Sequence, residues 1–188
     1  MTDRSPHFYH FVKTRLGKAA IVWFDDGRTV QIVRVCLPAP ENEIMGEIRG
    51  LFPDAKAQSC AAAAALAGKI QAFMAGKPVS FDTAALDMSR VAPYHRNVLA
   101  ALAAIPRGHV MSYGGVASKT GAPGGARAAG QGCAKNPFPI LFPCHRVIRS
   151  DGSLGGFGGG LKLKRALLEM EGIQFDKNGT VLPEHMIR

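Results

Sequence analysis

The first part of the chain contains three consecutive runs of β-forming residues, and this feature limits the folds that the sequence can adopt. The runs are HFYHFVKT (7–14), KAAIVWFDDG (18–27) and RTVQIVRVCL (28–37), separated by Leu16-Gly17 and by Asp25-Asp26-Gly27. An Asp-Gly step favours a tight turn between two strands. Residues 7–37 therefore predict a strand-rich start, and no later segment has the same character.

Residues 38–76 predict a break followed by two helices. PAPENE (38–43) forms the break, and EIMGEIRGLFP (43–53) has the pattern of a short helix that ends at Pro53. Residues 55–75 predict a longer helix that stops at Gly76. Its apolar face comprises Ala63, Leu66, Ala67, Ile70, Phe73 and Met74. Residues 77–93 are irregular and interrupted by proline, so we expect one domain over residues 1–90 and a second over residues 91–188.

The second half predicts a helix-turn-helix followed by a wing. A helix is expected over residues 94–105, and Ser112 is placed to cap a short helix within SYGGVASKTG (112–121). The turn APGG (122–125) leads to a second short helix, ARAAGQGCAKN (126–136). A cysteine-containing apolar segment, a glycine-rich hairpin (SDGSLGGFGGG, 150–160) and a final helix (161–172) complete the outline of a winged helix.

The charge of the chain is unevenly distributed. The 188 residues have a formal net charge of +9, and residues 107–165 contain nine Lys or Arg against the single acid Asp151. Such a local excess favours a polyanionic partner, with an ordinary basic surface as the alternative. The sequence has no apolar run of transmembrane length and no apolar stretch near its start that would indicate a signal peptide, so we expect a cytoplasmic protein without a membrane partner.

The second short helix consists almost entirely of small residues around one arginine. Arg127 is surrounded by Ala126, Ala128, Ala129, Gly130, Gly132 and Ala134. A smooth helix with one long cationic side chain suits close approach to a narrow DNA groove and extrusion of a base. Tight packing against a neighbouring helix is the alternative. The loop GGFGGG (155–160) lacks the Gly-Lys-Ser/Thr ending of a phosphate-binding loop, so it indicates a tight turn where backbone approaches another group closely.

Cys144 lies in LFPCHRVIRS (141–150), directly before a histidine and close to two arginines. A free thiol is mostly protonated at neutral pH, so a reactive cysteine needs a base or a positive charge nearby. His145 could serve as this base if a carboxylate fixed its tautomer, and Glu171 at the end of the last helix is well placed for that role. Spacing alone leaves a nucleophile and a buried structural thiol equally open. The four cysteines have no zinc-binding spacing.

The segments IPRGHVMSYGGVA, ARAAGQGCAKNP, NPFPILF, PCHRVI and GSLGGFGGGLKLKRALLEMEG resemble the O6-alkylguanine-DNA alkyltransferase family, also called methylated-DNA–protein-cysteine methyltransferases. The resemblance covers residues 93–172, whereas the first 90 residues match only in outline. It implies an α+β protein with a small RNase H-like N-terminal domain and a C-terminal winged-helix domain. It also implies direct repair of double-stranded DNA by a monomer without cofactor or metal.

The same resemblance assigns roles to individual residues. Cys144 would accept, once only, the alkyl group of a flipped O6-alkylguanine or O4-alkylthymine, with His145 as base through water, Glu171 as its orienting partner and Asn136 as a hinge. The base pocket would comprise Tyr113, Val147, Gly155, Phe157 and Gly158. The contacts to the DNA minor groove would come from Ser112, Ala126, Arg127, Ala128, Gly130 and Gly132, with Arg127 filling the vacated stack.

The sequence departs from the family pattern at several positions. Phe157 stands where many members have tyrosine, Phe142 replaces a smaller residue, and Tyr94-His95 and Leu99 replace Phe-Gln and tryptophan. These changes affect the shape of the pocket more than its chemistry.

His7, His10, Cys36 and His95 do not make a convincing zinc site. Three other interpretations predict different features. A relative that recognises alkylguanine without repairing it would lack Cys144. A winged-helix regulator would bind DNA without alkyl transfer, and a Cys/His hydrolase would need an oxyanion hole.

Overall fold

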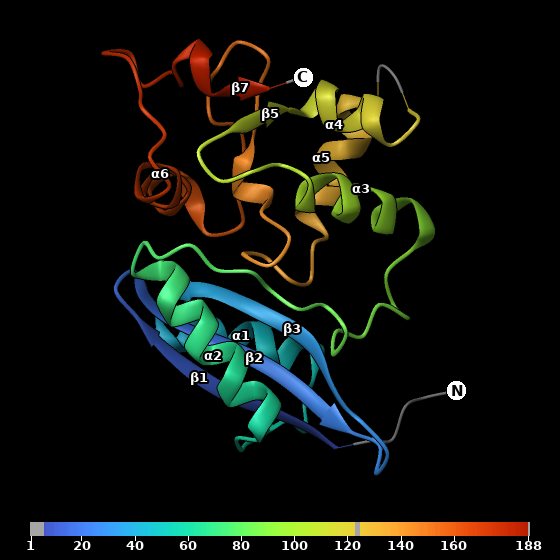
Figure 1. Ribbon diagram of the computed structural model, residues 1–188. Helices are drawn as coiled ribbons and strands as arrows, with labels where there is room; N and C mark the ends of the chain where they lie inside the picture. Colours follow the sequence, from blue (N-terminus) through green and yellow to red (C-terminus); the bar gives the residue numbers. More distant parts are fainter. Residues whose placement is uncertain (1–5, 123–124, 188) are drawn as a thin grey trace. The chain divides into compact units, whose positions relative to one another are not determined.

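The computed structural model describes residues 6–122 and 125–187, which form two compact units, one up to Met88 and one from Ser89 (Figure 1). Residues 1–5 lie outside this description, and the expected turn at residues 122–125 lies partly outside it. Both units combine helices with a sheet, so the expected mixed α/β character is present in each.

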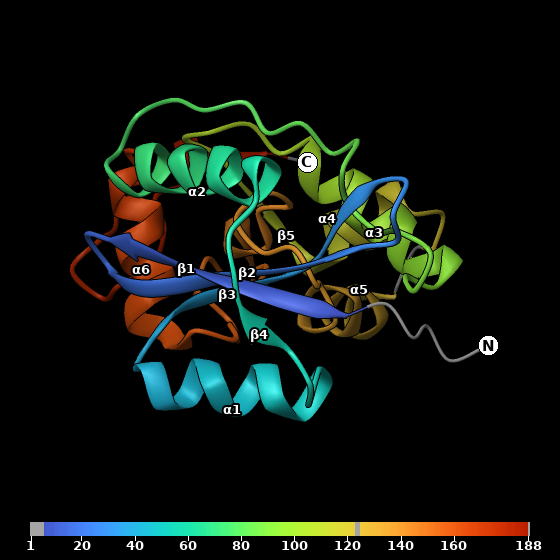
Figure 2. The same ribbon diagram turned by 90° about the horizontal axis from the view of Figure 1, so that it is seen from below.

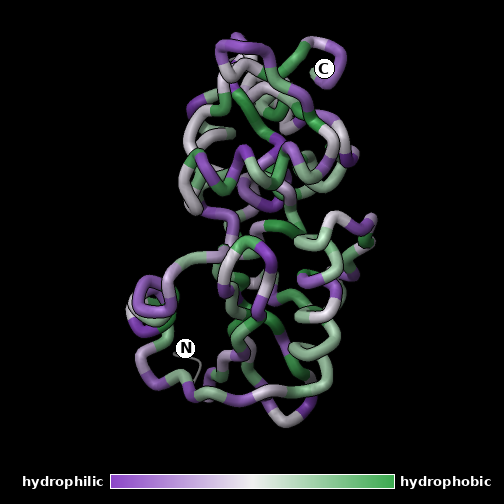
Figure 3. The backbone as a smooth tube through the Cα atoms, turned by 90° about the vertical axis from the view of Figure 1, so that its left-hand side faces the viewer, coloured by the Kyte–Doolittle hydropathy of each residue, from purple (hydrophilic) through white to green (hydrophobic). Residues whose placement is uncertain are grey.

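The first unit is built on a four-stranded sheet with the order β3-β2-β1-β4. The strands β1 (His7–Thr14), β2 (Gly17–Asp25) and β3 (Val30–Ala39) are antiparallel neighbours, as the Asp-Gly turn predicts. The short strand β4 (Lys56–Ala57) pairs in parallel with β1. Hydrophobic stretches, drawn in green, run through the first unit in Figure 3.

Residues 19–24 of strand β2 are apolar without interruption because both faces of the strand are covered. Helix α1 (Glu41–Leu51) and helix α2 (Ala61–Met74) pack on opposite faces of the sheet (Figure 2). Successive side chains of a strand point to opposite faces, so Val22 and Ile21 are buried in different layers. A strand with one solvent-exposed face would alternate apolar and polar residues. The covering of both faces therefore explains the uninterrupted apolar run in β2.

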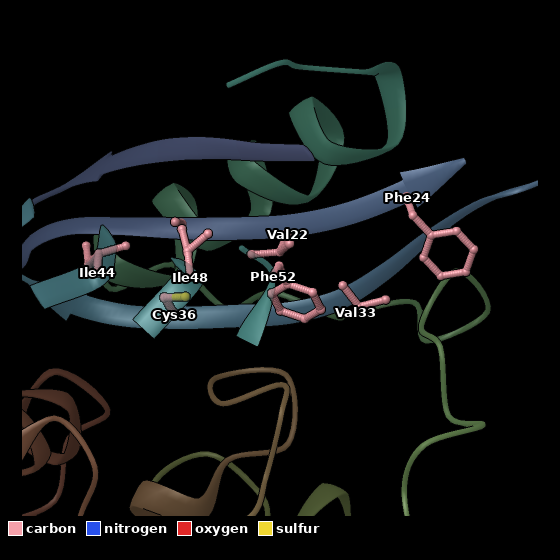
Figure 4. Packing of buried hydrophobic residues seen from close by; sticks show 8 residues of the cluster. Val22, Phe24, Val33, Cys36, Ile44, Ile48 and Phe52 are labelled. Atoms are coloured by element: carbon pink, nitrogen blue, oxygen red, sulfur yellow. The ribbon is translucent and has the colours of Figure 1, made fainter. Parts of the chain in front are cut away.

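The α1 face holds a compact apolar cluster (Figure 4). Ile44 and Ile48 of α1 lie over Val22 and Cys36 of the sheet, and all four side chains are nearly inaccessible to solvent. Burying an aliphatic side chain of this size stabilises a fold by about 1.5–3 kcal/mol. The cluster therefore fixes α1 to the sheet, and the ion pairs Arg34–Glu47 and Lys18–Glu41 add polar contacts between the same helix and the strands.

Two boundaries in the first unit differ from those expected. The predicted break at 38–43 is shorter, because β3 continues to Ala39 and α1 begins at Glu41. The helix expected over 55–75 begins only at Ala61, because the backbone at Lys56–Ala57 is used for pairing with β1. Cys60 then caps α2, with its Sγ accepting a hydrogen bond from the Ala63 backbone N–H at 3.4 Å. Helical periodicity alone could not reveal this strand pairing.

The second unit contains α3 (Pro93–Ala103), α4 (Tyr113–Lys119), α5 (Ala126–Ala134) and α6 (Gly160–Met170). Its short strands β5 (Val110–Ser112), β6 (Val147–Ile148) and β7 (Met186–Ile187) form a parallel sheet in the order β6-β5-β7. Ser112 caps α4 as expected, since its Oγ accepts from the Gly115 N–H at 3.0 Å.

The expected glycine-rich hairpin is not a strand pair. A turn closes where the Arg149 N–H donates to the Ser153 carbonyl at 2.9 Å, and the following segment to Gly159 has no strand. Glycines at 155–160 remove the side chains that stabilise cross-strand pairing, so the segment forms an irregular loop instead. Among the described residues, no helix has the length and apolar character needed to cross a membrane.

Candidate active site

Cys144 begins a short 3-10 turn (Cys144–Arg146) and is only 8% exposed. Asn136, two residues after the end of α5, makes two side-chain hydrogen bonds to the segment that leads to this turn. Its Nδ2 donates to the Phe142 carbonyl at 2.8 Å, and its Oδ1 accepts from the Phe138 N–H at 2.9 Å. The Cys144 N–H donates to the same Phe142 carbonyl at 2.8 Å. Asn136 and Cys144 therefore meet at one carbonyl oxygen, consistent with the hinge that the sequence predicts.

The segment that leads to this turn contains a backbone conformation that is costly for a branched residue. Ile140 is 3% exposed and has a φ of 75°. A non-glycine residue in this region costs roughly 1–3 kcal/mol and persists only where its surroundings fix it. The strained segment brings Phe142 back to Asn136 and so sets the position of the cysteine.

His145 and Glu171 form a fully buried pair beside Cys144. The His145 Nε2–H donates to Glu171 Oε1 at 3.1 Å, and neither side chain is exposed. Arg146 adds two further hydrogen bonds to the carboxylate, from Nε and Nη2, both at 2.8 Å. Its Nη1 donates to the Ile105 carbonyl. The sequence predicts the contact between His145 and Glu171 but not the contact between Arg146 and Glu171. The two hydrogen bonds from the Arg146 guanidinium depend on where α6 ends relative to the turn, which the sequence does not give.

The electrostatics of this pair fix the protonation of the histidine. Burial alone would raise the pKa of Glu171, but hydrogen bonds from His145 and Arg146 outweigh it and hold this pKa at about 2. Burial lowers the pKa of His145, and the contact with Glu171 only partly opposes this effect. At neutral pH the pair is a carboxylate and a neutral imidazole. Because Nε2 carries the proton given to Glu171, the proton-accepting lone pair of the imidazole lies on Nδ1.

Lys164 is a buried cation that sequence inspection does not single out. It is 0% exposed, and its Nζ donates to the carbonyls of Val147 at 2.6 Å, of Leu154, and of Gly156 at 3.4 Å. Residues 167 and 168, three and four positions later, are buried leucines, so the helical spacing could have placed this lysine on the inner face of α6. Burial lowers the pKa of Lys164 to about 8.

The pKa of the Cys144 thiol is subject to opposing effects. Burial raises the pKa of Cys144, while a hydrogen bond from Asn136 and the positive charge of Lys164 lower it. The thiol therefore remains protonated at rest, and its deprotonation needs both a proton acceptor and a stabilising charge.

Tyr113 lies between α5 and the glycine-rich loop. A Cβ atom at Gly155 would lie 2.9 Å from Cε2 of Tyr113, and one at Gly130 would lie 3.8 Å from its Cδ1. The tyrosine hydroxyl donates to the Gly156 carbonyl at 3.2 Å, and Lys164 Nζ lies 5.9 Å from the ring centroid. Gly155 also has a φ of 66°, so both close approach and conformation require glycine there. The loop is thus shaped around Tyr113.

The small residues of α5 divide into two sets. Ala126 and Arg127 are exposed at the start of the helix, and Ala128 and Gly130 are half-buried. Gly132 is buried, and a Cβ there would lie 2.9 Å from Cγ2 of Val98 on α3. Gly132 therefore serves helix packing, the alternative that the sequence left open for this helix, and its contact with DNA stays a prediction.

The remaining predicted residues lie around the same loop. Val147 is buried and gives its carbonyl to Lys164, Phe157 is half-buried, and Gly158 is exposed. Ser112 is half-buried, and its side chain is used in the helix cap. Within residues 6–122 and 125–187, no group of three or more His, Cys, Asp or Glu side chains could hold a metal ion.

The sequence matches relatives that share this arrangement. The family model described as 6-O-methylguanine DNA methyltransferase, DNA binding domain, matches residues 93–173. A methylated-DNA–protein-cysteine methyltransferase of Methanothermobacter thermautotrophicus is 38% identical over 156 residues, which cover 83% of this chain and 80% of the relative. The protein of the same name from Mycobacterium tuberculosis is 47% identical over 103 residues, covering 55% of this chain and 61% of that relative.

Solved structures agree over most of the chain. The O6-methylguanine methyltransferase of M. tuberculosis superposes with a TM-score of 0.68 at 32% identity, covering 88% of this chain and 92% of the other. A structure of the M. tuberculosis protein in complex with DNA gives a TM-score of 0.68 at 33% identity, covering 87% and 92%. Fold and site thus define a methyltransferase that uses a cysteine and acts in DNA repair. More particularly, the chain belongs to the methylated-DNA–protein-cysteine methyltransferase family, which confirms the resemblance seen in the sequence.

Proposed function

We propose that this protein repairs double-stranded DNA directly, by moving the alkyl group of O6-alkylguanine, and of O4-alkylthymine, onto the Cys144 thiol in a single turnover. The observation that carries the proposal is the buried set of Cys144, His145 and Glu171 on one turn and one helix end. A cysteine with this low exposure cannot reach a base that remains stacked in a duplex. The base must therefore be flipped out of the helix and into the unit.

The proposed chemistry follows from the protonation states. Glu171 is ionised and accepts the Nε2 proton of neutral His145, so Nδ1 can receive the Cys144 proton through a water molecule. The thiolate attacks the alkyl carbon, a carbon–sulfur bond forms, and the bond from that carbon to O6 breaks. Guanine leaves with the electron pair, and a proton from the Tyr113 hydroxyl neutralises it. The thioether does not hydrolyse, which limits each molecule to one reaction.

Lys164 supports the same reaction in two ways. Its charge favours the thiolate over the thiol at Cys144. Its hydrogen bonds to three backbone carbonyls hold the strand after the cysteine and the glycine-rich loop in one arrangement. We propose that Tyr113, Val147, Gly155, Phe157 and Gly158 line the base pocket formed in this way.

We propose that α5 enters the minor groove. Its exposed start presents Ala126 and Arg127 with no bulky neighbour, so the helix can approach the sugar-phosphate backbone while Arg127 fills the vacated stack. We also propose an RNase H-like domain over residues 1–90, a winged-helix domain over residues 91–188, and a monomer on DNA, as the resemblance seen in the sequence implies. The irregular loop 153–159 occupies the place of the wing.

The proposal is tested by the intact mass of the protein after incubation with a duplex that contains one O6-methylguanine. We expect a gain of one methyl group in place of hydrogen, saturating at one equivalent, and no gain for Cys144→Ala. Tight binding without a change in mass would show a recognition protein instead. A parallel series with O4-methylthymine tests the second lesion.

A further inference from the structure

The C-terminal tail (residues 174–187) follows α6 and lies beyond the residues that the family model matches. It returns to the rest of the second unit, where β7 pairs in parallel with β5 (Figure 1). Val181 of the tail is buried in an apolar cluster together with Val110 and Leu168. The tail is therefore packed into the second unit, and the proposed reaction gives it no role.

His185 of this tail connects two segments that are distant from each other in the sequence. Its Nδ1 donates to the Gly108 carbonyl at 3.0 Å, and its Nε2 accepts from the Gln174 N–H at 3.1 Å. A carbonyl can only accept and a backbone N–H can only donate, so both hydrogen bonds require the same neutral tautomer, with the proton on Nδ1. One ring nitrogen thus binds the turn after α3, and the other binds the chain that leaves α6.

Gly108 belongs to the turn between α3 and β5 (residues 104–109), and this turn contacts the end of α6 that carries Glu171. The Arg107 Nη2 donates to the Met170 carbonyl at 2.8 Å. A Cβ atom at Gly108 would lie 3.7 Å from the carbonyl oxygen of Glu171. The turn therefore supports the backbone of Glu171 directly.

The same turn also holds the second partner of the Glu171 side chain. The Nη1 of Arg146 donates to the Ile105 carbonyl, while its Nε and Nη2 donate to the Glu171 carboxylate. The carboxylate that binds His145 is thus fixed in two ways, through its own backbone and through Arg146, and both depend on the turn. A hydrogen bond that anchors the turn therefore acts on the geometry of His145 and Glu171.

We propose that His185 is a positioning residue for alkyl transfer, because its hydrogen bond to the turn keeps the Glu171 carboxylate aligned with His145. Its effect on the rate rests on the proposed function of Cys144, whereas its effect on the contact between His145 and Glu171 does not. Misplacement of a reacting group by about 1 Å can slow a reaction by roughly 100-fold, so a small movement of the turn is sufficient for a measurable effect.

Three substitutions of His185 separate the two hydrogen bonds of its ring. In His185→Asn the amide nitrogen stands at the place of Nδ1 and can still donate to Gly108, whereas His185→Gln places its amide near Nε2 and His185→Ala makes neither bond. We expect single-turnover transfer from a saturating O6-methylguanine duplex to slow by about tenfold or more in His185→Ala and His185→Gln. His185→Asn should stay near the wild-type rate, and the affinity for the duplex should not change in any variant.

Glu184→Gln is the matched control, because Glu184 is the exposed neighbour of His185 in the same short helical turn (Pro183–His185). It changes the charge of the tail without removing either hydrogen bond of the ring, so it should transfer the methyl group at the wild-type rate. A fall as large as that of His185→Ala would assign the effect to the charge of the tail and overturn the proposal.

The contact between His145 and Glu171 can be measured without DNA, by the NMR signal of the His145 Nε2 proton in protein with isotope-labelled histidine. Because this proton is bound to a buried carboxylate, it should resonate far downfield and exchange slowly with water in the wild type and in His185→Asn. In His185→Ala it should move upfield and exchange faster. An unchanged signal in His185→Ala would overturn the proposal, even if transfer slows. A changed signal, in a protein whose wild type transfers no methyl group, would contradict only the proposed function of Cys144.

Discussion

The two units differ in the groups that they bury beside their apolar residues. The cluster between α1 and the sheet is wholly apolar, and Ile44, Ile48 and Val22 are almost inaccessible. The second unit also has an apolar cluster, formed by Val110, Ile148, Leu168, Ile173 and Val181, but in addition it buries His145, Lys164 and Glu171. Burying charge costs several kcal/mol unless each group is paired and hydrogen-bonded. The first unit is thus held by apolar packing, whereas the second retains costly buried groups that the proposed alkyl transfer would use.

The largest effect is expected where the buried charge pair is broken. Glu171→Gln leaves Arg146 without a countercharge, and loss of one partner of a buried pair costs about 3–5 kcal/mol of unfolding free energy. It also removes the group that orients His145, so alkyl transfer should slow sharply. Chemical denaturation and single-turnover kinetics measure the two effects.

Glu169→Gln is the matched control for this variant. Glu169 lies on the same helix and pairs with Arg165, but both side chains are exposed, at 51% and 43%. Such surface pairs contribute about 0–1 kcal/mol. Equal destabilisation by both substitutions would contradict the distinction between the two ion pairs.

The apolar cluster should respond differently. Ile48→Ala removes a side chain that is 1% exposed, and truncations of this kind cost about 2–5 kcal/mol. Because no polar group of the site lies in this cluster, the rate of alkyl transfer at a temperature where the variant is folded should not change. A large fall in the rate of the fully folded variant would show that the first unit participates in the reaction.

The pH dependence of stability should come from the second unit. The pKa of Glu171 is about 2 in the fold and 4.5 as its reference value, so its contribution is complete above pH 4.5 and disappears as the pH falls toward 2. This difference corresponds to about 3 kcal/mol. The lowered pKa of His145 acts in the same direction below its reference value of 6.5, because the unfolded chain binds the proton more readily.

Urea denaturation between pH 8 and pH 3 measures this dependence. We expect the free energy of unfolding to fall continuously with acidification, and the fall below pH 4.5 to be smaller in Glu171→Gln. If the free energy of unfolding falls below pH 4.5 as steeply in Glu171→Gln as in the wild type, other carboxylates cause this fall.

The smallest effect is expected from Lys164→Met, which keeps the volume of the stem and removes the charge. Transfer should slow by about tenfold at neutral pH, the equivalent of one pKa unit at Cys144. In the wild type, the contribution of Lys164 to the rate of alkyl transfer should be lost as the pH rises through about 8, because the side chain loses its charge. The variant should show no such change. Lys162→Met, an exposed position on the same helix, should retain the wild-type profile.

The comparison of the units also explains what the sequence can predict. Runs of β-forming residues predict β2 and β3, and helical periodicity predicts the buried face of α2, because these signals lie within the strand or helix itself. The short strand at Lys56–Ala57 and the role of Lys164 depend on partners distant in the sequence. The motif around Cys144 predicts the contact of His145 with Glu171, but the packing of Gly132 on Val98 needed the position of α3.

The most direct test of the account locates the transferred group. After reaction with one equivalent of a duplex that contains O6-methylguanine, trypsin separates Asn136–Arg146, with Cys144, from Ala128–Lys135, with Cys133. The account predicts a single methyl group on Cys144 and none on Cys133, Cys36 or Cys60. A methyl group on another cysteine, or none on the protein while the lesion is repaired, would contradict it.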